Sequence, residues 1–182
     1  MGFRYDIRLS GEGGQGLVLA SRILAEAAAI YDEKNATQSQ SYGPEARGGA
    51  SRSDVVISDE DIDYPKAVTI DLLLAFTPES CSKYTKDMKE NGILLVDSGA
   101  VTKVPEGSYK VFKVPITDIA RERVGKTVLA NIVALGMIVE LTKVVSVDAL
   151  EAAILSRVPK GTEELNIKAF KTGLEVAREL NR

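Results

Sequence analysis

Two short apolar runs limit what this chain can fold into more than any other feature of its sequence. Residues 71–76 and 93–96 are almost continuously apolar, as is typical of parallel strands that are covered on both faces of a sheet. After the first run, Thr77 can cap a helix and Pro78 suits its first position. We expect this helix to end near residues 91–92, just before the second run. The segment therefore predicts parallel strands joined by a helix.

The chain opens with another strand, which leads through a glycine-rich turn into a helix. Residues 3–9 alternate between apolar and charged side chains, which predicts a strand. Residues 11–16 read Gly-Glu-Gly-Gly-Gln-Gly and predict a tight turn. Residues 17–30 are rich in Leu, Ala, Ile and Glu and contain no Gly or Pro, which favours about four helical turns.

The rest of the chain continues this alternation and ends in helices. Residues 35–41 are polar and predict a short strand at best, while residues 42–49 contain Gly and Pro and predict a shaped loop. Further strands are expected at 53–58 and 109–114, and helices near 127–142, 148–157 and 162–180. We expect a single α/β domain over residues 1–182: a three-layer α/β/α sandwich with a Rossmann-like sheet, mainly parallel or mixed, and a helical C-terminal third.

Composition argues against several classes of function. The net charge is −3 and no basic stripe is visible, which argues against nucleic acid as a partner. Arg4, Asp6 and Arg8 interrupt the N-terminal segment, so it lacks the apolar stretch of a secretory signal. No later apolar run is long enough to span a bilayer. We therefore expect a cytoplasmic protein that does not enter membranes.

The choice of catalytic groups is narrow. The only cysteine, Cys81, cannot form an intrachain disulfide, and by itself it cannot hold zinc or an iron–sulfur cluster. The chain contains no histidine, the residue used most often for proton transfer near neutral pH. We expect no catalytic residue and no metal site in this chain, and no activity of the chain alone.

Gly11, Gly13 and Gly16 match the pattern Gly-x-Gly-x-x-Gly between a strand and a helix, where backbone N–H groups and a helix N-terminus can bind a phosphate. A dinucleotide site also needs an acidic residue about 20 residues further on for the ribose. Residues 36–40 contain none, and the acidic residues 32–33 come too early. In the alternative interpretation, the glycines only allow a tight turn and close packing. In either case we expect a β-branched side chain at Gly13 to obstruct the turn or the approach to it.

Two arginines flank a second pair of glycines. Arg47 and Arg52 lie on either side of residues 48–49, so guanidinium groups stand beside backbone that a phosphate or carboxylate can approach. The arginines could equally pair with acidic residues of a partner chain, because arginine is enriched at interfaces. Tyr42 could stack on an adenine or contact a partner. These alternatives stay open at the level of the sequence.

Two further groups of residues have both a site interpretation and a structural one. Thr77 and residues 97–98 follow expected parallel strands, where ligands gather in open α/β sheets. A helix cap and a turn are the commoner uses of these residues. The apolar helix at 128–139 requires burial around most of its surface, either between subunits or in the core. Gly136 would permit close approach of another helix, and Asn131 would supply a polar anchor.

The glycine-rich turn and the shaped loop together resemble a known family. The motif Gly-Glu-Gly-Gly-Gln-Gly at 11–16, followed by Ser-Tyr-Gly-Pro-Glu-Ala-Arg-Gly-Gly-Ala-Ser at 41–51, is similar to the paired signature of the gamma domain of 2-oxoacid:ferredoxin oxidoreductases. The similarity extends to about residue 140 and thins in the last helices. The second motif resembles the 2-oxoglutarate type; pyruvate, indolepyruvate and branched-chain 2-oxoacids are alternative substrates.

Members of this family oxidatively decarboxylate a 2-oxoacid on thiamine diphosphate, pass electrons through iron–sulfur clusters to ferredoxin, and transfer the acyl group to coenzyme A. For 2-oxoglutarate the product is succinyl-CoA. The resemblance implies a non-redox gamma subunit that works with alpha-, beta- and ferredoxin-like delta-type subunits. Thiamine diphosphate, Mg and the clusters would lie on those partners, and coenzyme A would be a shared ligand. The rival functions are a free-standing nucleotide-binding oxidoreductase and a purely structural assembly subunit.

The candidate ligand-binding residues belong to the two glycine-rich motifs. They are Gly11, Gly13, Gly14, Gln15, Gly16, Tyr42, Gly43, Arg47, Gly48 and Gly49. The sequence leaves open whether they contact coenzyme A or only a partner chain.

Overall fold

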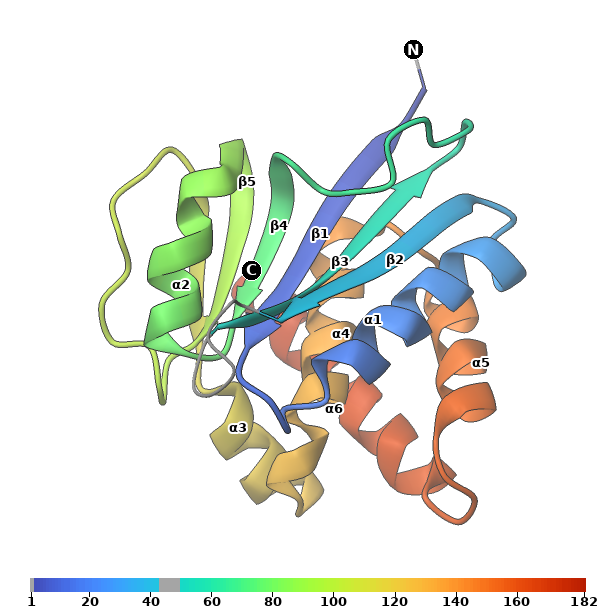
Figure 1. The fold of residues 1–182 in the computed structure, drawn as a ribbon. Coiled ribbons are helices and arrows are strands. Elements are labelled where there is room, and N and C mark those ends of the chain that lie inside the picture. The colour runs from blue at the N-terminus through green and yellow to red at the C-terminus, as the bar shows by residue number, and fades with distance from the viewer. Residues whose placement is uncertain (1, 43–49) are drawn as a thin grey trace.

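The computed structural model of the chain describes residues 2–42 and 50–182. Within these ranges, six strands form one sheet in the order β2-β3-β1-β4-β5-β6 (Figure 1). The strands are β1 (Arg4–Gly11), β2 (Asn35–Tyr42), β3 (Ser51–Ser58), β4 (Ile70–Ala75), β5 (Met88–Asp97) and β6 (Lys110–Val114). The helices are α1 (Leu17–Glu26), α2 (Pro78–Tyr84), α3 (Ile116–Ile119), α4 (Ala130–Thr142), α5 (Val147–Arg157) and α6 (Glu163–Leu180). π-helical turns extend α1 over Ala27–Tyr31 and α3 over Ala120–Val124.

The sheet is mixed. β1, β4, β5 and β6 run parallel to one another, whereas β3 is antiparallel to both β1 and β2. Among the described strands, three of the five pairings are therefore parallel, which confirms the expected mainly parallel or mixed sheet. Because parallel strands share a direction, the carboxyl ends of β1, β4, β5 and β6 meet at one edge of the sheet.

The polar segment at 35–41 forms a longer strand than expected. β2 covers eight residues and pairs with β3 along its whole length, from Asn35 opposite Ser58 to Tyr42 opposite Ser51. The expectation of a short strand at best is wrong. β2 lies at the end of the strand order, where polar side chains are tolerated, and the antiparallel ladder with β3 satisfies its backbone on the inner side.

The helix after the first apolar run begins as expected but ends earlier. The side chain of Thr77 caps α2 by accepting a hydrogen bond from the backbone N of Ser80 at 3.2 Å, and Pro78 lies in the first turn. The helix ends at Tyr84. The expected end near residues 91–92 is therefore wrong.

Asn91 and Gly92 instead form an irregularity inside β5. Met88 and Ile93 pair with β4 in different registers, so the strand bulges between them. Asn91 has a φ of 63°, a left-handed conformation that asparagine tolerates better than most residues. The Asn-Gly pair thus marks a break in regular backbone, but the break lies within a strand and not at a helix end.

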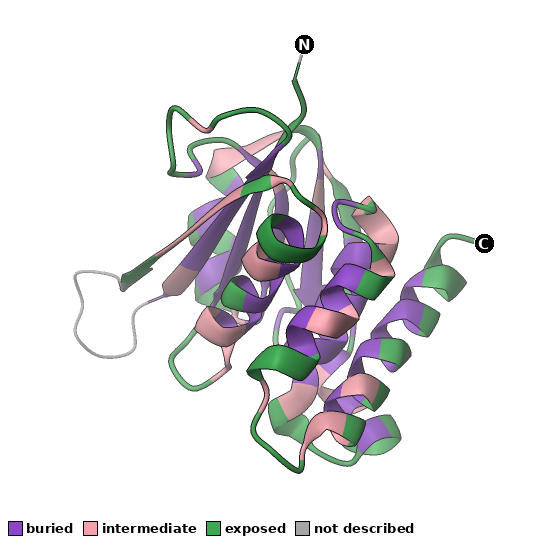
Figure 2. Cartoon of the chain, turned by 90° about the vertical axis from the view of Figure 1, so that its right-hand side faces the viewer, coloured by how far each residue is buried: buried purple, intermediate pink, exposed green. Residues whose placement is uncertain are grey.

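Helices cover both faces of the sheet, although unequally. α1, α4, α5 and α6 pack on one face in a large core that includes Leu72 and Leu74. α2 covers part of the other face, where Cys81 and Tyr84 pack near Leu73. Figure 2 shows the buried sides of the helices turned toward the sheet and their exposed sides turned outward. This arrangement confirms the expected layers and the helical C-terminal third. Cys81 is buried beneath α2, and burial raises the pKa of its thiol.

The apolar helix α4 is buried by the chain's own core. Its residues 130–139 are all buried, and α6 packs along it through two glycines. A Cβ on Gly136 would collide with the backbone of Phe170, and a Cβ on Gly173 would collide with the backbone of Val133. Burial in the core therefore accounts for the apolar sequence, and Gly136 permits close helix approach as expected.

We expect Gly173→Ala to destabilise the chain by about 1–3 kcal/mol, because an added methyl group must push α6 away from α4. Each kcal/mol should lower Tm by about 2–4 °C in a domain of this size, which thermal unfolding followed by circular dichroism would measure. Gly99→Ala is the control, since its Cβ would lie 3.5 Å from Asp118 Oδ2, an ordinary contact distance. Equal Tm values for the two variants would contradict the assigned helix contact.

Candidate functional site

The carboxyl ends of the parallel strands bring several of the predicted residues to one edge. The loop between β1 and α1 and the short helix α3 lie beyond the same end of the sheet (Figure 1). Thr77 follows β4, and Asp97 ends β5, at this edge. In open α/β sheets ligands bind at such an edge, so it is the first place to examine for a site.

Two glycines of the loop are required by its geometry. Gly14 and Gly16 have φ values of 89° and 72°, in the left-handed region that favours glycine. A Cβ on Gly11 would collide only with the end of the flexible Gln15 side chain and would lie 3.2 Å from the Cβ of Phe76. The tight turn proposed from the sequence is therefore real, whether or not a ligand binds.

Asn131 holds the glycine loop against α4. Its Nδ2 donates to the backbone O of Gly16 at 3.0 Å, and its Oδ1 accepts from the backbone N of Ile132 at 2.9 Å. Within the loop, Gln15 Oε1 accepts from the backbone N of Glu12 at 2.8 Å. Asn131 is thus the expected polar anchor, and the group that it holds is the glycine loop of the same chain.

An open hollow of about 340 Å³ lies against the loop. It is lined by the loop, the start of α1 and the start of β3: Glu12, Gly13, Gly14, Gly16, Leu17, Val18, Leu19, Ser51, Arg52 and Ser53. Apart from its two chain neighbours, no described residue has an atom within 4 Å of where a Cβ on Gly13 would lie. The turn itself has room for a Cβ there, and the expected obstruction of the approach to the turn stays a prediction. The N-terminus of α1 has no side-chain cap and carries partial positive charge. The hollow therefore has partial positive charge at the start of α1 and the carboxylate of Glu12 in its lining.

A buried arginine ties the central strand to three neighbouring segments. The Arg8 side chain is 1% exposed, and its Nε and Nη2 donate to the two carboxylate oxygens of Asp54 at 2.8 and 3.1 Å. Its Nη1 donates to Asp87 Oδ2 at 2.7 Å, and Nη2 also donates to the carbonyl O of Ala67 at 3.1 Å. Burial alone would lower the pKa of Arg8, but the hydrogen bonds and charges of Asp54 and Asp87 outweigh burial and raise the pKa. The guanidinium group stays charged.

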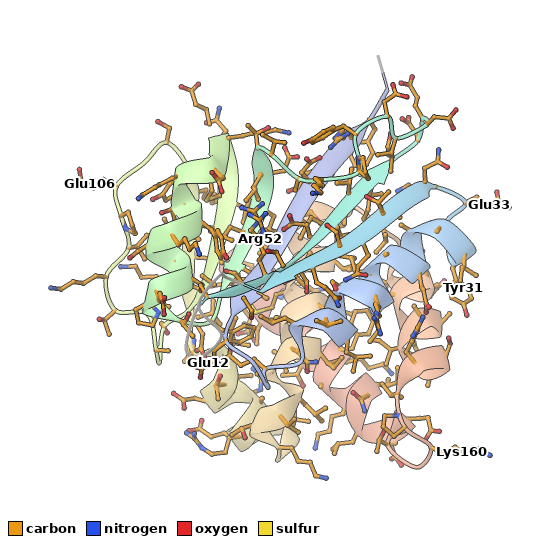
Figure 3. The ribbon with its side chains drawn as sticks, viewed as in Figure 1. Glu12, Tyr31, Glu33, Arg52, Glu106 and Lys160 are labelled. Atoms are coloured by element: carbon orange, nitrogen blue, oxygen red, sulfur yellow. The ribbon has the colours of Figure 1, made fainter. Side chains whose placement is uncertain are left out.

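Arg52 borders the hollow at the start of β3, and its side chain points to the face of the sheet that α2 covers (Figure 3). Its Nε lies 4.0 Å from Asp54 Oδ2, and its guanidinium carbon lies 5.8 Å from the centroid of the Tyr84 ring. Because both oxygens of Asp54 already accept hydrogen bonds from Arg8, this carboxylate compensates Arg52 only weakly. The Arg52 side chain is 32% exposed, so an anion in solution can reach it.

The structure brings together the first of the two predicted motifs but describes only the ends of the second. Residues 11–16 form the glycine loop. Tyr42 ends β2 opposite Ser51, at the end of the hairpin nearest Gly11, and its side chain is outside the described part. The remaining predicted residues, Gly43, Arg47, Gly48 and Gly49, also lie outside the described residues.

Thr77 and Asp97 are used inside the fold. Thr77 caps α2, while Asp97 is buried and accepts from Thr117 Oγ1 at 2.6 Å and from the backbone N of Gly99 at 3.4 Å. The backbone N of Ser98 donates to β6. For these residues the structure supports the cap and turn interpretations rather than contact with a ligand.

Comparison with known proteins identifies the family. The chain matches the family described as pyruvate ferredoxin/flavodoxin oxidoreductase over residues 6–176. The chain belongs to this family. The assignment confirms the resemblance seen in the two glycine-rich motifs.

Individual members of the pyruvate ferredoxin/flavodoxin oxidoreductase family are similar along the whole chain. The 2-oxoglutarate synthase subunit KorC of Methanocaldococcus jannaschii is 54% identical over 179 residues, which cover 97% of this chain and 96% of the relative. The gamma subunit of a keto/oxoacid ferredoxin oxidoreductase from Geobacter sulfurreducens is 56% identical, with a TM-score of 0.88, over 96% of this chain and 99% of that one.

A larger protein shares the fold alone. The 2-oxoglutarate:ferredoxin oxidoreductase of Magnetococcus marinus, solved with 2-oxoglutarate, coenzyme A and succinyl-CoA bound, has a TM-score of 0.84 at 22% identity. The match covers 97% of this chain and 31% of that chain. The fold of the present chain therefore also occurs as one part of a longer polypeptide.

Three residues of the ionic cluster that contacts Arg52 were missed from the sequence. Arg8 and Asp54 look like the polar positions of alternating strands, and Tyr84 looks like an ordinary helical residue. Only the register of β1 against β3, in which Arg8 is opposite Asp54, shows that the two charges form a buried pair. Without a known strand pairing, no signal in the sequence singled them out.

Among residues 2–42 and 50–182, no group of three or more His, Cys, Asp or Glu side chains is placed to hold a metal ion. Over the same residues, no helix combines the length and the apolar character needed to cross a membrane.

We expect Asn131→Ala to destabilise the chain by about 0.5–1.5 kcal/mol, because it removes one of the two hydrogen bonds to the Gly16 carbonyl and leaves the one from the backbone N of Ala20. Urea unfolding of the two proteins would measure the difference. Asn35→Ala is a matched control, since Asn35 Nδ2 also donates to a backbone carbonyl, that of Glu60, but in an exposed position. A loss at Asn131 no greater than the loss at Asn35 would refute the anchoring role.

Proposed function

We propose that this chain is the gamma subunit of a complex that oxidatively decarboxylates 2-oxoglutarate to succinyl-CoA and reduces ferredoxin. The observation that carries the proposal is the 54% identity, over nearly the full length of both chains, to the 2-oxoglutarate synthase subunit KorC of Methanocaldococcus jannaschii. The similarity to a gamma subunit from Geobacter sulfurreducens supports the subunit type. The 2-oxoglutarate-type motif at residues 41–51 supports the same substrate.

In this proposal the redox and decarboxylation steps belong to partner subunits of alpha, beta and delta type. The chain has no histidine and one cysteine, and that cysteine is buried. It also lacks the Gly-Asp-Gly motif with a following Asn that would hold Mg and thiamine diphosphate. Its residues therefore do not fit those groups, and we assign thiamine diphosphate, Mg and the iron–sulfur clusters to the partners.

The role that remains for this chain is to bind a phosphate-bearing part of coenzyme A at the glycine loop. Backbone at Gly13 and Gly14 carries no side chain that would keep a phosphate away, and the start of α1 favours negative charge. Arg52 borders the hollow, and its partly exposed guanidinium group would turn from the face that α2 covers to donate hydrogen bonds to phosphate oxygens. A dinucleotide is disfavoured, because the segment at 36–40 has no acidic residue for the ribose.

We expect the isolated chain to reduce no acceptor with 2-oxoglutarate and coenzyme A, because it cannot supply the electron relay or a carbanion-stabilising cofactor. Adding it to the purified partner subunits should give a stable complex with turnover measured by ferredoxin reduction. Partners that turn over equally fast without this chain would contradict the subunit role, and faster turnover with pyruvate than with 2-oxoglutarate would overturn the proposed substrate.

We expect calorimetric titration of the chain to detect coenzyme A and not NADH. Arg52→Ala should weaken coenzyme A binding by about tenfold to 100-fold, the range for losing a hydrogen bond to a charged group. Arg178→Ala is the control, because Arg178 also contacts a carboxylate, that of Glu140, but lies outside the hollow. Binding of NADH instead would favour the free-standing oxidoreductase, and binding of neither compound would favour a purely structural assembly subunit.

A further inference from the structure

β2 is an open edge of the sheet. It lies at the end of the strand order, and β3 pairs with one of its two sides. Apart from that ladder, no backbone N–H or C=O of residues 35–41 takes part in a hydrogen bond with another described residue. Figure 2 views the molecule from this side and shows exposed and partly buried residues along the strand.

The strand pairings show which residues of β2 direct their backbone outward. Ser10 O accepts from Phe76 N on the β4 side of β1. Phe3 O accepts from Asp59 N on the β3 side. Since alternate residues of a strand direct N–H and C=O to opposite sides, the odd-numbered residues of β1 face β3. In the observed registers, the odd-numbered residues of β2 then face β3. Its even-numbered residues therefore direct their N–H and C=O outward: Ala36, Gln38 and Gln40.

The two edges of the sheet differ in how they are protected against further pairing. β6 has five residues, carries Lys110 and Lys113, and is followed by Pro115. Short length, lysine and proline are features with which natural edge strands avoid another strand. β2 has eight residues, pairs with β3 without a register shift, and contains no charged residue, Pro or Gly. Such a long, uncharged edge is a template for strand addition.

α1 brings a positive charge to the same side of the molecule. Gln38 Nε2 donates to Ser21 Oγ at 3.1 Å, so the side of α1 that contains Ser21 lies against β2. The next residue, Arg22, is exposed, and within the described part of the chain it forms no ion pair. Ala25 and Ala29 follow on the same side of the helix at spacings of three and four residues. A strand that pairs with β2 therefore meets small side chains and one guanidinium group.

We propose that β2 is a docking edge, at which an extended segment of a partner subunit joins the sheet with an acidic side chain placed toward Arg22. A second copy of this chain fits less well. Pairing β2 with β2 would bring two α1 helices side by side, and with them two Arg22 side chains of like charge. A segment with a carboxylate avoids that repulsion and gains an attraction. The inference rests on the proposed function, because it takes the occupant from the partner subunits.

Hydrogen exchange of single amides in the assembled complex tests the docking edge. In the chain alone, the amides of residues 37, 39 and 41 bond to β3 and should exchange about tenfold more slowly than those of 36, 38 and 40. Adding the partner subunits should slow the even-numbered amides about tenfold, because a new strand would accept hydrogen bonds from them.

The outcomes separate this inference from the proposed function. A complex that reduces ferredoxin while the amides of 36, 38 and 40 still exchange fast would overturn the docking edge and leave the proposed function intact. A chain that does not assemble with the partner subunits would overturn both. Slowing of these amides in the chain alone, in step with its concentration, would assign the edge to a second copy and overturn the proposed occupant.

Two proline variants test the backbone directions. Gln40→Pro removes an outward N–H, where an edge strand tolerates proline, so Tm should stay within about 4 °C of the original chain. Its Kd for the partner subunits should rise about fivefold, as for one lost hydrogen bond. Ser39→Pro removes an N–H that faces β3 and should lower Tm further. Equal losses of Tm in the two variants would overturn the assigned directions and the docking edge with them.

The acidic character of the occupant is tested by charge reversal. Arg22→Glu should raise the Kd for the partner subunits about fivefold, because an exposed attraction becomes a repulsion, and added salt should reduce the effect. Lys160→Glu is the matched control, since Lys160 is also an exposed cation but lies between α5 and α6. Its Kd should stay within about twofold of the original chain. Equal Kd values for the two variants would overturn the acidic occupant.

Discussion

The buried pair of Arg8 and Asp54 is the interaction on which the rest of the architecture depends. It crosses from the central strand to β3 with both carboxylate oxygens engaged, and further bonds from Arg8 reach Asp87 and Ala67. Removing one partner from a buried pair typically costs about 3–5 kcal/mol, because the other charge stays buried without compensation. The pair also joins the antiparallel hairpin of β2 and β3 to the parallel strands of the sheet. It places charged side chains on the face of the sheet that α2 covers.

This ionic layer contrasts with the opposite face of the sheet. There, α1, α4, α5 and α6 form an apolar core that closes around residues such as Leu72 and Leu74. The apolar side stabilises the fold, while the ionic side holds Arg52 next to Asp54 and Tyr84. Arg52 is therefore supported by buried charges but is not itself fully buried.

The sequence predicted the elements whose signals are local. The apolar runs at 71–76 and 93–96 became β4 and part of β5, and the cap at Thr77 is where it was expected. The length of β2 was underestimated because backbone hydrogen bonds to β3 stabilise this edge strand. Such bonds do not require an apolar pattern in the strand's own side chains. The role of the Asn-Gly pair at 91–92 was predicted wrongly, because a left-handed backbone conformation occurs both at helix ends and in strand bulges.

The candidate site divides in the same way. The glycine loop at 11–16 was visible because its required conformations restrict residue type locally. The ionic cluster of Arg8, Asp54 and Tyr84 could not be predicted, because it depends on which strand lies beside which and on where α2 crosses them. Pairing at long sequence separation is the information that a single sequence carries least clearly.

The contact between Gly136 and Gly173 also reaches beyond stability. It sets how deeply α4 lies against α6, and the first turn of α4 carries Asn131, which holds the carbonyl of Gly16. A larger residue at Gly136 or Gly173 would push α4 away from α6. The side-chain amide of Asn131 would then move away from the glycine loop. The distance between α4 and α6 therefore helps to fix the position of the glycine loop. Substitutions in these helices can change the shape of the hollow although they lie far from it.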